Sequence, residues 1–105
     1  GENREKNEEF MIEFNLKDEE ICKLLMQIEY SDFCECLHPY DVLRNHEDYY
    51  LFAPEFTLTD LFGDELQVIV YVKIIIKNDK ANQPFLVVVS FHRPDESKAL
   101  NYQFK

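Results

Sequence analysis

Four side chains near the C-terminal end of this 105-residue chain have the chemistry needed for acid–base work on a phosphate group. Tyr71 and Lys73 lie in one apolar segment, and Ser90 and His92 lie in the next. Histidine titrates near neutral pH, lysine neutralises a phosphate charge, and a tyrosine or serine hydroxyl can position an attacking group. No triad spacing links the four residues, so composition alone favours a structural role for them on a half-solvated strand face.

Two apolar segments carry these four residues, and they predict a β-hairpin. Residues 66–77 and 84–93 are rich in strand-forming side chains and are joined by the polar residues 78–83. Because side chains alternate between the two faces of a strand, even positions of the first segment and odd positions of the second form matching apolar faces. We expect these faces to pack on a helix, which leaves the four chemically interesting side chains together on the opposite, mixed face.

The register of this hairpin decides which of the four side chains meet. A compact loop around residue 80 predicts that paired positions sum to 161, so that Tyr71 lies opposite Ser90, and Ile69 opposite His92. Tyr71 and His92 are then diagonal neighbours, roughly 7 to 8 Å apart at the backbone, a distance that two rings can bridge. A register shift of two residues would leave the same side chains on each face of the sheet, but we expect it to separate Tyr71 from His92.

An amphipathic helix over residues 16–29 is the predicted partner of the apolar sheet face. Apolar residues recur in it at helical spacing, at Ile21, Leu24, Leu25 and Ile28. Asn15 is the expected N-cap. Ser31 and Asp32 offer a second capping point, so a short helical continuation should follow and end at Pro39.

The whole pattern predicts a single α+β domain over residues 10–105, with the helical segments packed on an antiparallel sheet of three to four strands. Residues 49–58 predict a strand at a sheet edge or bulge, because Pro54 cannot donate to a ladder. Residues 60–64 contain a glycine and supply a turn. Residues 1–9 contain no hydrophobic side chain, so they predict a disordered lead-in.

The cysteines and histidines raise the question of a metal site. Three cysteines at short spacings favour reduced thiols over disulfides. Four residues at short spacings could in principle bind one zinc ion: Cys34, Cys36, His38 and His46. Structural zinc sites usually show two well-spaced ligand pairs, and the second pair is missing here. The sequence therefore predicts no metal and no cofactor, with Cys22 and Cys36 as small packed side chains and the histidines in surface loops.

The formal net charge of −10 is distributed unevenly along the chain. Residues 1–65 hold eighteen acidic and five basic side chains, whereas residues 66–105 hold three acidic and six basic ones. An acidic protein repels nucleic acid at long range, but the basic C-terminal part can still bind a phosphate locally. The longest apolar run, residues 68–76, is too short for a membrane helix, and no secretory signal is visible. We therefore expect a cytoplasmic location and no membrane partner.

Five sequence blocks, taken in order, resemble the MqsR family of type II toxins, which are small ribonucleases of the RelE-like fold. The blocks are DEEICKLLMQI, SDFCECL, YYLFAPEF, VYVKIII and VVVSFH, and they span roughly residues 14–93. The resemblance implies a RelE-like fold and metal-independent endoribonuclease cleavage of messenger RNA. It also implies two partners, an RNA substrate and a cognate antitoxin protein.

By position, the resemblance gives catalytic roles to Tyr71, in the VYVKI block, and to His92, where family members more often have lysine. The expected substrate-binding residues are Lys73, Ser90 and Tyr49. Glu35 stands where the family has a lysine, so one phosphate-binding charge is absent, and the family's Trp-Gln-Asp before the next strand is also missing. The competing prediction is a catalytically inactive acidic module of the same fold that binds another protein.

Overall fold

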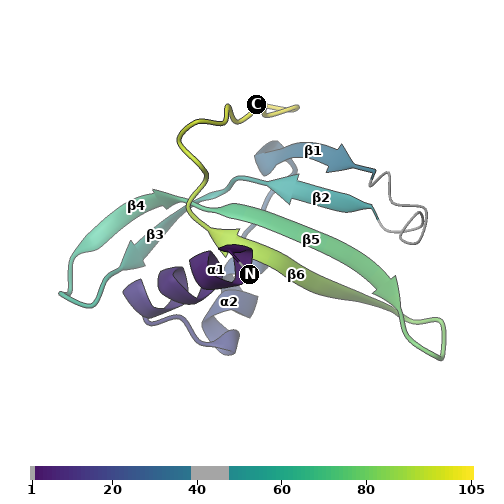
Figure 1. Ribbon diagram of the computed structural model, residues 1–105, viewed down its shortest axis with the longest axis horizontal. Coiled ribbons are helices and arrows are strands. Elements are labelled where there is room, and N and C mark those ends of the chain that lie inside the picture. Colours follow the sequence, from purple (N-terminus) through teal and green to yellow (C-terminus); the bar gives the residue numbers. More distant parts are fainter. Residues whose placement is uncertain (1, 39–47) are drawn as a thin grey trace.

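The computed structural model describes residues 2–38 and 48–105 (Figure 1). In chain order the elements are α1 (Glu2–Glu13), α2 (Asp18–Leu25), a 3₁₀ turn (Tyr30–Asp32), β1 (Phe33–Leu37), β2 (Tyr49–Phe52), β3 (Glu55–Thr59), β4 (Glu65–Ile69), β5 (Tyr71–Asn78) and β6 (Pro84–His92). Four strands form an antiparallel sheet in the order β1-β2-β5-β6, and β3 pairs with β4 in a separate hairpin. The predicted α+β fold class, with helices on an antiparallel sheet, is confirmed.

Both helices pack on one face of the larger sheet (Figure 1). The buried residues of this main core include Phe10, Phe14, Ile21 and Leu24 from the helices and Val70, Val72, Ile74 and Phe91 from the sheet and its approach. Phe10 meets Phe91 edge to face at a centroid distance of 5.9 Å, and Val72 and Phe91 are fully buried. Burying a side chain of this size is worth about 1.5–3 kcal/mol, so these contacts hold α1 on β6. In the described residues, no helix is long and apolar enough to cross a membrane.

The N-terminal segment is helical, so the prediction of disorder is wrong for residues 2–9. Its hydrophobicity is low, but Asn7 binds the backbone of β6 through both ends of its amide. The Asn7 side chain donates to the carbonyl oxygen of Val89 at 3.0 Å and accepts from the backbone N–H of Phe91 at 2.8 Å. These hydrogen bonds and the buried Phe10 compensate for the polar composition of the helix.

The helical segments are shorter than predicted. The predicted helix over 16–29 is α2, Asp18–Leu25, and Asn15 is not its N-cap: Asn15 has a positive φ of 49° and precedes the helix. Lys17 is the N-cap, and its backbone N–H donates to the carboxylate of Glu20 at 3.1 Å. A local capping interaction three residues into the helix therefore sets where it begins.

The predicted helical continuation is correct for one turn and wrong after it. Tyr30–Asp32 is a 3₁₀ turn, held by a hydrogen bond from the backbone N–H of Glu29 to the carboxylate of Asp32 at 2.8 Å. The next residues, Phe33–Leu37, form β1 and pair with β2. Pairing with a neighbouring strand overrides the local helical signal in this segment. Pro39 lies outside the described residues.

The hairpin of β5 and β6 has a register different from the predicted one. Tyr71 pairs directly with His92, so paired positions there sum to 163 rather than 161, and Lys73 pairs with Ser90. The prediction that a two-residue shift would separate Tyr71 from His92 is therefore wrong, because this shift brings them face to face. Two features cause it: the turn is centred near residue 81 and not 80, and a β-bulge follows Lys73.

The turn and the bulge also alter which side chains reach the core. At the turn, the Asp79 carboxylate accepts from the backbone N–H groups of Ala81 and Gln83, and Asn82 has a φ of 61°. After the bulge the alternation on β6 is displaced by one residue, so Val88 packs on the core where Val87 and Val89 were expected.

The first apolar segment is likewise two strands rather than one. It breaks at residue 70, where β4 leaves to pair with β3, and at its far end Ile75 is buried while Ile76 is 54% exposed. Pro54 lies between β2 and β3, where the chain passes from one sheet to the other. The predicted turn at 60–64 is confirmed: the Asp60 carboxylate accepts from two backbone N–H groups, and Gly63 has a φ of 84° that favours glycine.

Candidate functional site

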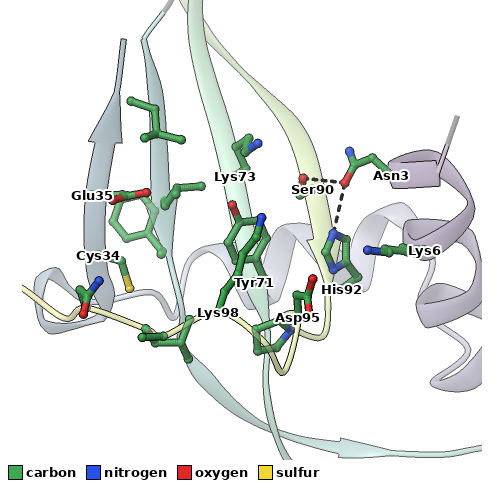
Figure 2. A pocket seen from close by; sticks show the side chains of 17 residues that line it. Asn3, Lys6, Cys34, Glu35, Tyr71, Lys73, Ser90, His92, Asp95 and Lys98 are labelled. Carbon is green, nitrogen blue, oxygen red and sulfur yellow. Dashed lines mark hydrogen bonds between the residues drawn. The ribbon is translucent and has the colours of Figure 1, made fainter. Parts of the chain in front are cut away.

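A pocket of about 330 Å³ lies on the sheet face opposite the main core (Figure 2). Its floor follows one row of paired residues across the sheet, from Glu35 on β1 through Leu51 and Lys73 to Ser90 on β6. One wall is the start of α1, and the other is the segment after β6, residues 94–101. The four residues singled out in the hairpin, Tyr71, Lys73, Ser90 and His92, all line this pocket.

Tyr71 and His92 stack in the pocket as a cross-strand pair. Their ring centroids are 5.5 Å apart with an interplanar angle of 24°. Burial, with smaller effects from Glu35 and Cys34, raises the pKa of Tyr71 above its usual value. The Tyr71 hydroxyl therefore keeps its proton at neutral pH and is available as a hydrogen-bond donor.

His92 is held by two oxygen atoms, one at each ring nitrogen. Nδ1 lies 2.6 Å from the carbonyl oxygen of Arg93, and Nε2 lies 3.1 Å from Oδ1 of Asn3. The orientation of the Asn3 amide is fixed, because its Nδ2 donates to the carbonyl oxygen of Val89 at 2.7 Å and its Oδ1 accepts from the Ser90 hydroxyl at 2.9 Å. With an acceptor at each nitrogen, only the protonated ring makes both hydrogen bonds.

Three lysines face the pocket from three different segments: Lys6 of α1, Lys73 of β5 and Lys98 of the C-terminal segment (Figure 2). Burial, and then the positive charge of Lys98, lower the pKa of Lys73, and Glu35 partly opposes this. A bound anion would remove the repulsion between the two ammonium groups. The pocket is thus locally suited to a phosphate despite the acidity of the whole chain.

Two carboxylates line the same pocket, and their surroundings differ. Hydrogen bonds from the backbone N–H and hydroxyl of Ser97 to Oδ1 lower the pKa of Asp95, and the charges of Lys6 and Lys98 lower it further. Asp95 therefore caps its own turn. Glu35 projects from β1 beside Leu51 and is exposed, which leaves it as the carboxylate that a ligand can reach.

The C-terminal segment, which forms one wall of the pocket, is held on the sheet by hydrogen bonds and by packing. The Tyr102 hydroxyl donates to the carbonyl oxygen of Ala53 at 2.7 Å, and the backbone N–H of Gln103 donates to the carbonyl oxygen of Phe33 at 3.1 Å. Leu100 and Tyr102 pack on a small second core of Cys34, Leu51 and Ala53. These contacts fix Lys98 and Asp95 over the sheet.

Tyr49, the remaining predicted substrate-binding residue, lies beside the pocket and not in its lining. It is next to Leu51 along the same face of β2, and the ammonium group of Lys73 is 5.4 Å from the centre of its ring. Sequence reasoning missed Asn3, Lys6 and Lys98. A signal for the first was present: Asn3 and Asn7 continue the stripe of Phe10 and Phe14 at spacings of four, three and four.

No family model, no curated protein and no solved structure matches this chain. The resemblance to the MqsR toxins therefore stays a prediction.

Proposed function

We propose that this pocket binds the sugar–phosphate backbone of RNA and cleaves it without a metal ion. The observation that carries the proposal is the stacked pair of His92 and Tyr71 beside the ammonium groups of Lys73 and Lys98. These groups supply a proton donor, a hydroxyl and two positive charges in one cavity. In-line attack on a phosphodiester needs such groups close to one phosphate.

The proposed reaction is an internal transfer of the phosphoryl group. The ribose 2′-oxygen attacks the adjacent phosphorus and passes its proton to the carboxylate of Glu35. The bond from phosphorus to the 5′-oxygen breaks, and protonated His92 gives its proton to that oxygen. The products are a 2′,3′-cyclic phosphate and a free 5′-hydroxyl.

Four other residues support this reaction through binding. The Tyr71 hydroxyl donates to a non-bridging phosphate oxygen, and Lys73 and Lys98 balance the charge that develops on the phosphoryl group. Tyr49, beside Lys73, offers a ring on which an unpaired base stacks. Single-stranded RNA is therefore the proposed substrate, as the resemblance to messenger-RNA-cleaving toxins also implies. On the same reasoning, a cognate antitoxin protein is the proposed partner, and the cytoplasm the proposed location.

The test of this function is the structure of the products. The full chain is incubated in EDTA with a single-stranded RNA and with the same strand carrying 2′-deoxyribose throughout. We expect cyclic phosphate ends from the RNA and no cleavage of the deoxy strand. The Glu35→Gln variant should be slower by about 10²–10⁴-fold, the usual contribution of one acid or base. Cleavage of the deoxy strand would contradict the proposed chemistry.

A second candidate function is binding of another protein, and one feature favours it. At the tip of the β3–β4 hairpin, Leu61 and Phe62 are 63% and 90% exposed. These two apolar side chains are adjacent at the hairpin tip, where a partner protein could cover them. Wild-type protein that leaves RNA intact, in EDTA and without it, would favour this second function over the first.

A further inference from the structure

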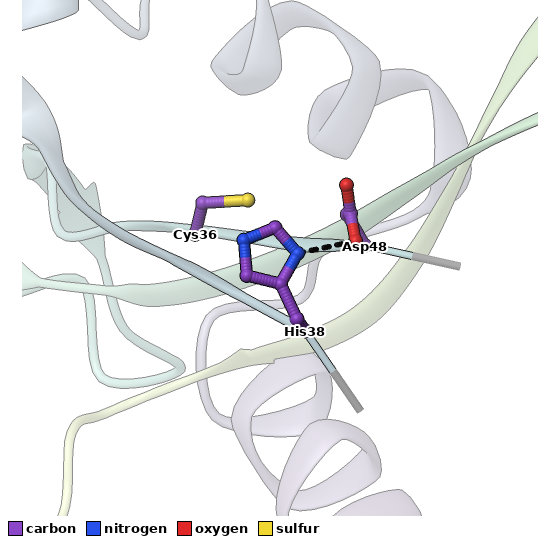
Figure 3. Close-up of side chains that lie close together, drawn as sticks. All are labelled: Cys36, His38 and Asp48. Atoms are coloured by element: carbon purple, nitrogen blue, oxygen red, sulfur yellow. Dashed lines mark hydrogen bonds and ion pairs between the residues drawn. The ribbon is translucent and has the colours of Figure 1, made fainter. Parts of the chain in front are cut away.

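Three chemically different ligand groups meet at the outer end of the β1–β2 hairpin (Figure 3). Cys36 pairs with Tyr50, and Leu37 pairs with Tyr49, so His38 and Asp48 follow at the next position on the two strands. The Cys36 sulfur, an imidazole nitrogen of His38 and a carboxylate oxygen of Asp48 all lie within 4.8 Å of one another. Nδ1 of His38 is 2.7 Å from Oδ1 of Asp48.

We propose that Cys36, His38 and Asp48 bind one zinc ion. Thiolate, imidazole and carboxylate are the ligands that zinc prefers, with bonds of about 2.0–2.3 Å. Tetrahedral geometry with such bonds places ligand atoms roughly 3.5 Å apart. Zinc binding replaces the hydrogen bond between His38 and Asp48, and the 74% exposure of the His38 side chain leaves room for the rotations that bring the three groups this close. The thiol of Cys36 loses its proton to solvent on binding, and a water molecule fills the fourth position.

The site is separate from the pocket. Glu35 and Leu37 line the pocket, and Cys36, between them on β1, points to the opposite face. An ion at this place links β1 to β2 directly. Its role is therefore to stabilise the edge of the sheet, and the proposed RNA cleavage does not depend on it.

The same three residue types also form nucleophilic triads, which need a binding place for a substrate beside the thiol. These three side chains stand outside the lining of the pocket of Figure 2. Their mutual spacing at the hairpin end is that of groups gathered around one ion.

The sequence alone indicated two of these three ligands but predicted no metal site. Cys36 and His38 were candidate ligands there, but the expected partners were Cys34 and His46. Cys34 is buried on the pocket side, and His46 lies outside the described residues. The missing ligand, Asp48, is ten residues from His38 along the chain and becomes its neighbour only through the pairing of β1 with β2.

The test is titration of the full, metal-free chain with Zn²⁺ by calorimetry and with Co²⁺ by absorption spectroscopy. We expect one ion per chain, a thiolate-to-cobalt charge-transfer band, and a higher Tm with zinc. The His38→Ala and Asp48→Asn variants should each bind zinc at least tenfold more weakly, and Cys36→Ser should lose the charge-transfer band. Circular dichroism of each variant confirms that it is folded.

Cys22→Ser is the matched control, because Cys22 is an exposed thiol on α2. This variant should bind zinc as the wild type does. The proposal would be overturned by an equal loss of zinc binding in Cys22→Ser, by unchanged zinc binding in His38→Ala, or by no zinc binding in the wild type. RNA cleavage measured in EDTA is independent of all these outcomes, so the two proposals fail separately.

Discussion

At the scale of single residues, His92 and Lys73 owe their proposed roles to neighbours on other elements. His92 is held by Asn3 of α1 and stacked on Tyr71 of β5. Lys73 is half-buried on the sheet and repelled by Lys98 across the pocket. The repulsion between Lys73 and Lys98 favours a ligand of negative charge in the space between them.

Lys73 gives a prediction about RNA binding. The Lys73→Ala variant should bind single-stranded RNA more weakly, and its affinity should depend less steeply on salt. Loss of one phosphate contact reduces the slope of log K against log salt by about 0.7 for a single strand. Affinity measured by fluorescence anisotropy at several salt concentrations gives this slope. Lys80→Ala, an exposed lysine in the β5–β6 turn, is the control and should leave the slope unchanged; equal effects of the two variants would argue against the pocket.

At the scale of elements, α1 matters most for the site, because it supplies one wall and holds it against β6. Replacement of Asn7 by alanine removes two hydrogen bonds to the β6 backbone. Loss of buried hydrogen bonds of this kind should lower the free energy of unfolding by about 1–3 kcal/mol. Urea denaturation measures the change. Glu5→Ala, on the exposed side of the same helix, should change stability by less than about 0.5 kcal/mol; a similar cost for both variants would mean that α1 is not docked through Asn7.

The end of α1 predicts a pH dependence of stability. Arg93 lies over the rings of Phe10 and Phe14 and donates to the Glu13 carboxylate, with one of the two bonds at 2.8 Å. The hydrogen bond from Arg93 lowers the pKa of Glu13 below its usual 4.5. A lowered folded-state pKa means that the ion pair stabilises the protein above about pH 4.5, and that this stability is lost as the pH falls through the folded value.

Glu13→Gln tests this dependence. Because both side chains are partly exposed, the wild type should exceed the variant at pH 7 by no more than about 1 kcal/mol in free energy of unfolding. The difference should begin to shrink near pH 4.5 and should vanish at lower pH. Urea denaturation at several pH values measures it. A difference that stays constant down to pH 3 would show that the Glu13 charge has no role.

The elements also show what the sequence can and cannot predict. The alternation of the hairpin strands places Tyr71, Lys73, Ser90 and His92 on one face, because period 2 is a local property. Their register is not local: the turn chemistry of Asp79 and the bulge after Lys73 decide it. The polar residues in the helical stripe of α1 could not be predicted from composition for a similar reason. Their role depends on β6 lying beside the helix, which the local sequence does not show.

At the scale of the whole molecule, an acidic chain encloses a locally basic pocket. The net charge is −10, but lysines from α1, β5 and the C-terminal segment converge on one cavity. The helices cover the other face of the sheet (Figure 1). The three residues of the proposed zinc site, at the end of the β1–β2 hairpin, are not part of the pocket lining. Long-range charge therefore opposes the approach of RNA, while the pocket favours its phosphate at contact.

The most direct measurement is RNA cleavage in EDTA by the wild-type chain beside the His92→Ala variant. Both proteins are first shown by circular dichroism to be folded, and Lys80→Ala serves as the control substitution. We predict cleavage by the wild type and by the control, and a loss of at least about 10²-fold in His92→Ala, the lower end of what a general acid contributes. Equal cleavage by wild type and His92→Ala, or none by the wild type, would contradict a metal-independent ribonuclease site in this pocket.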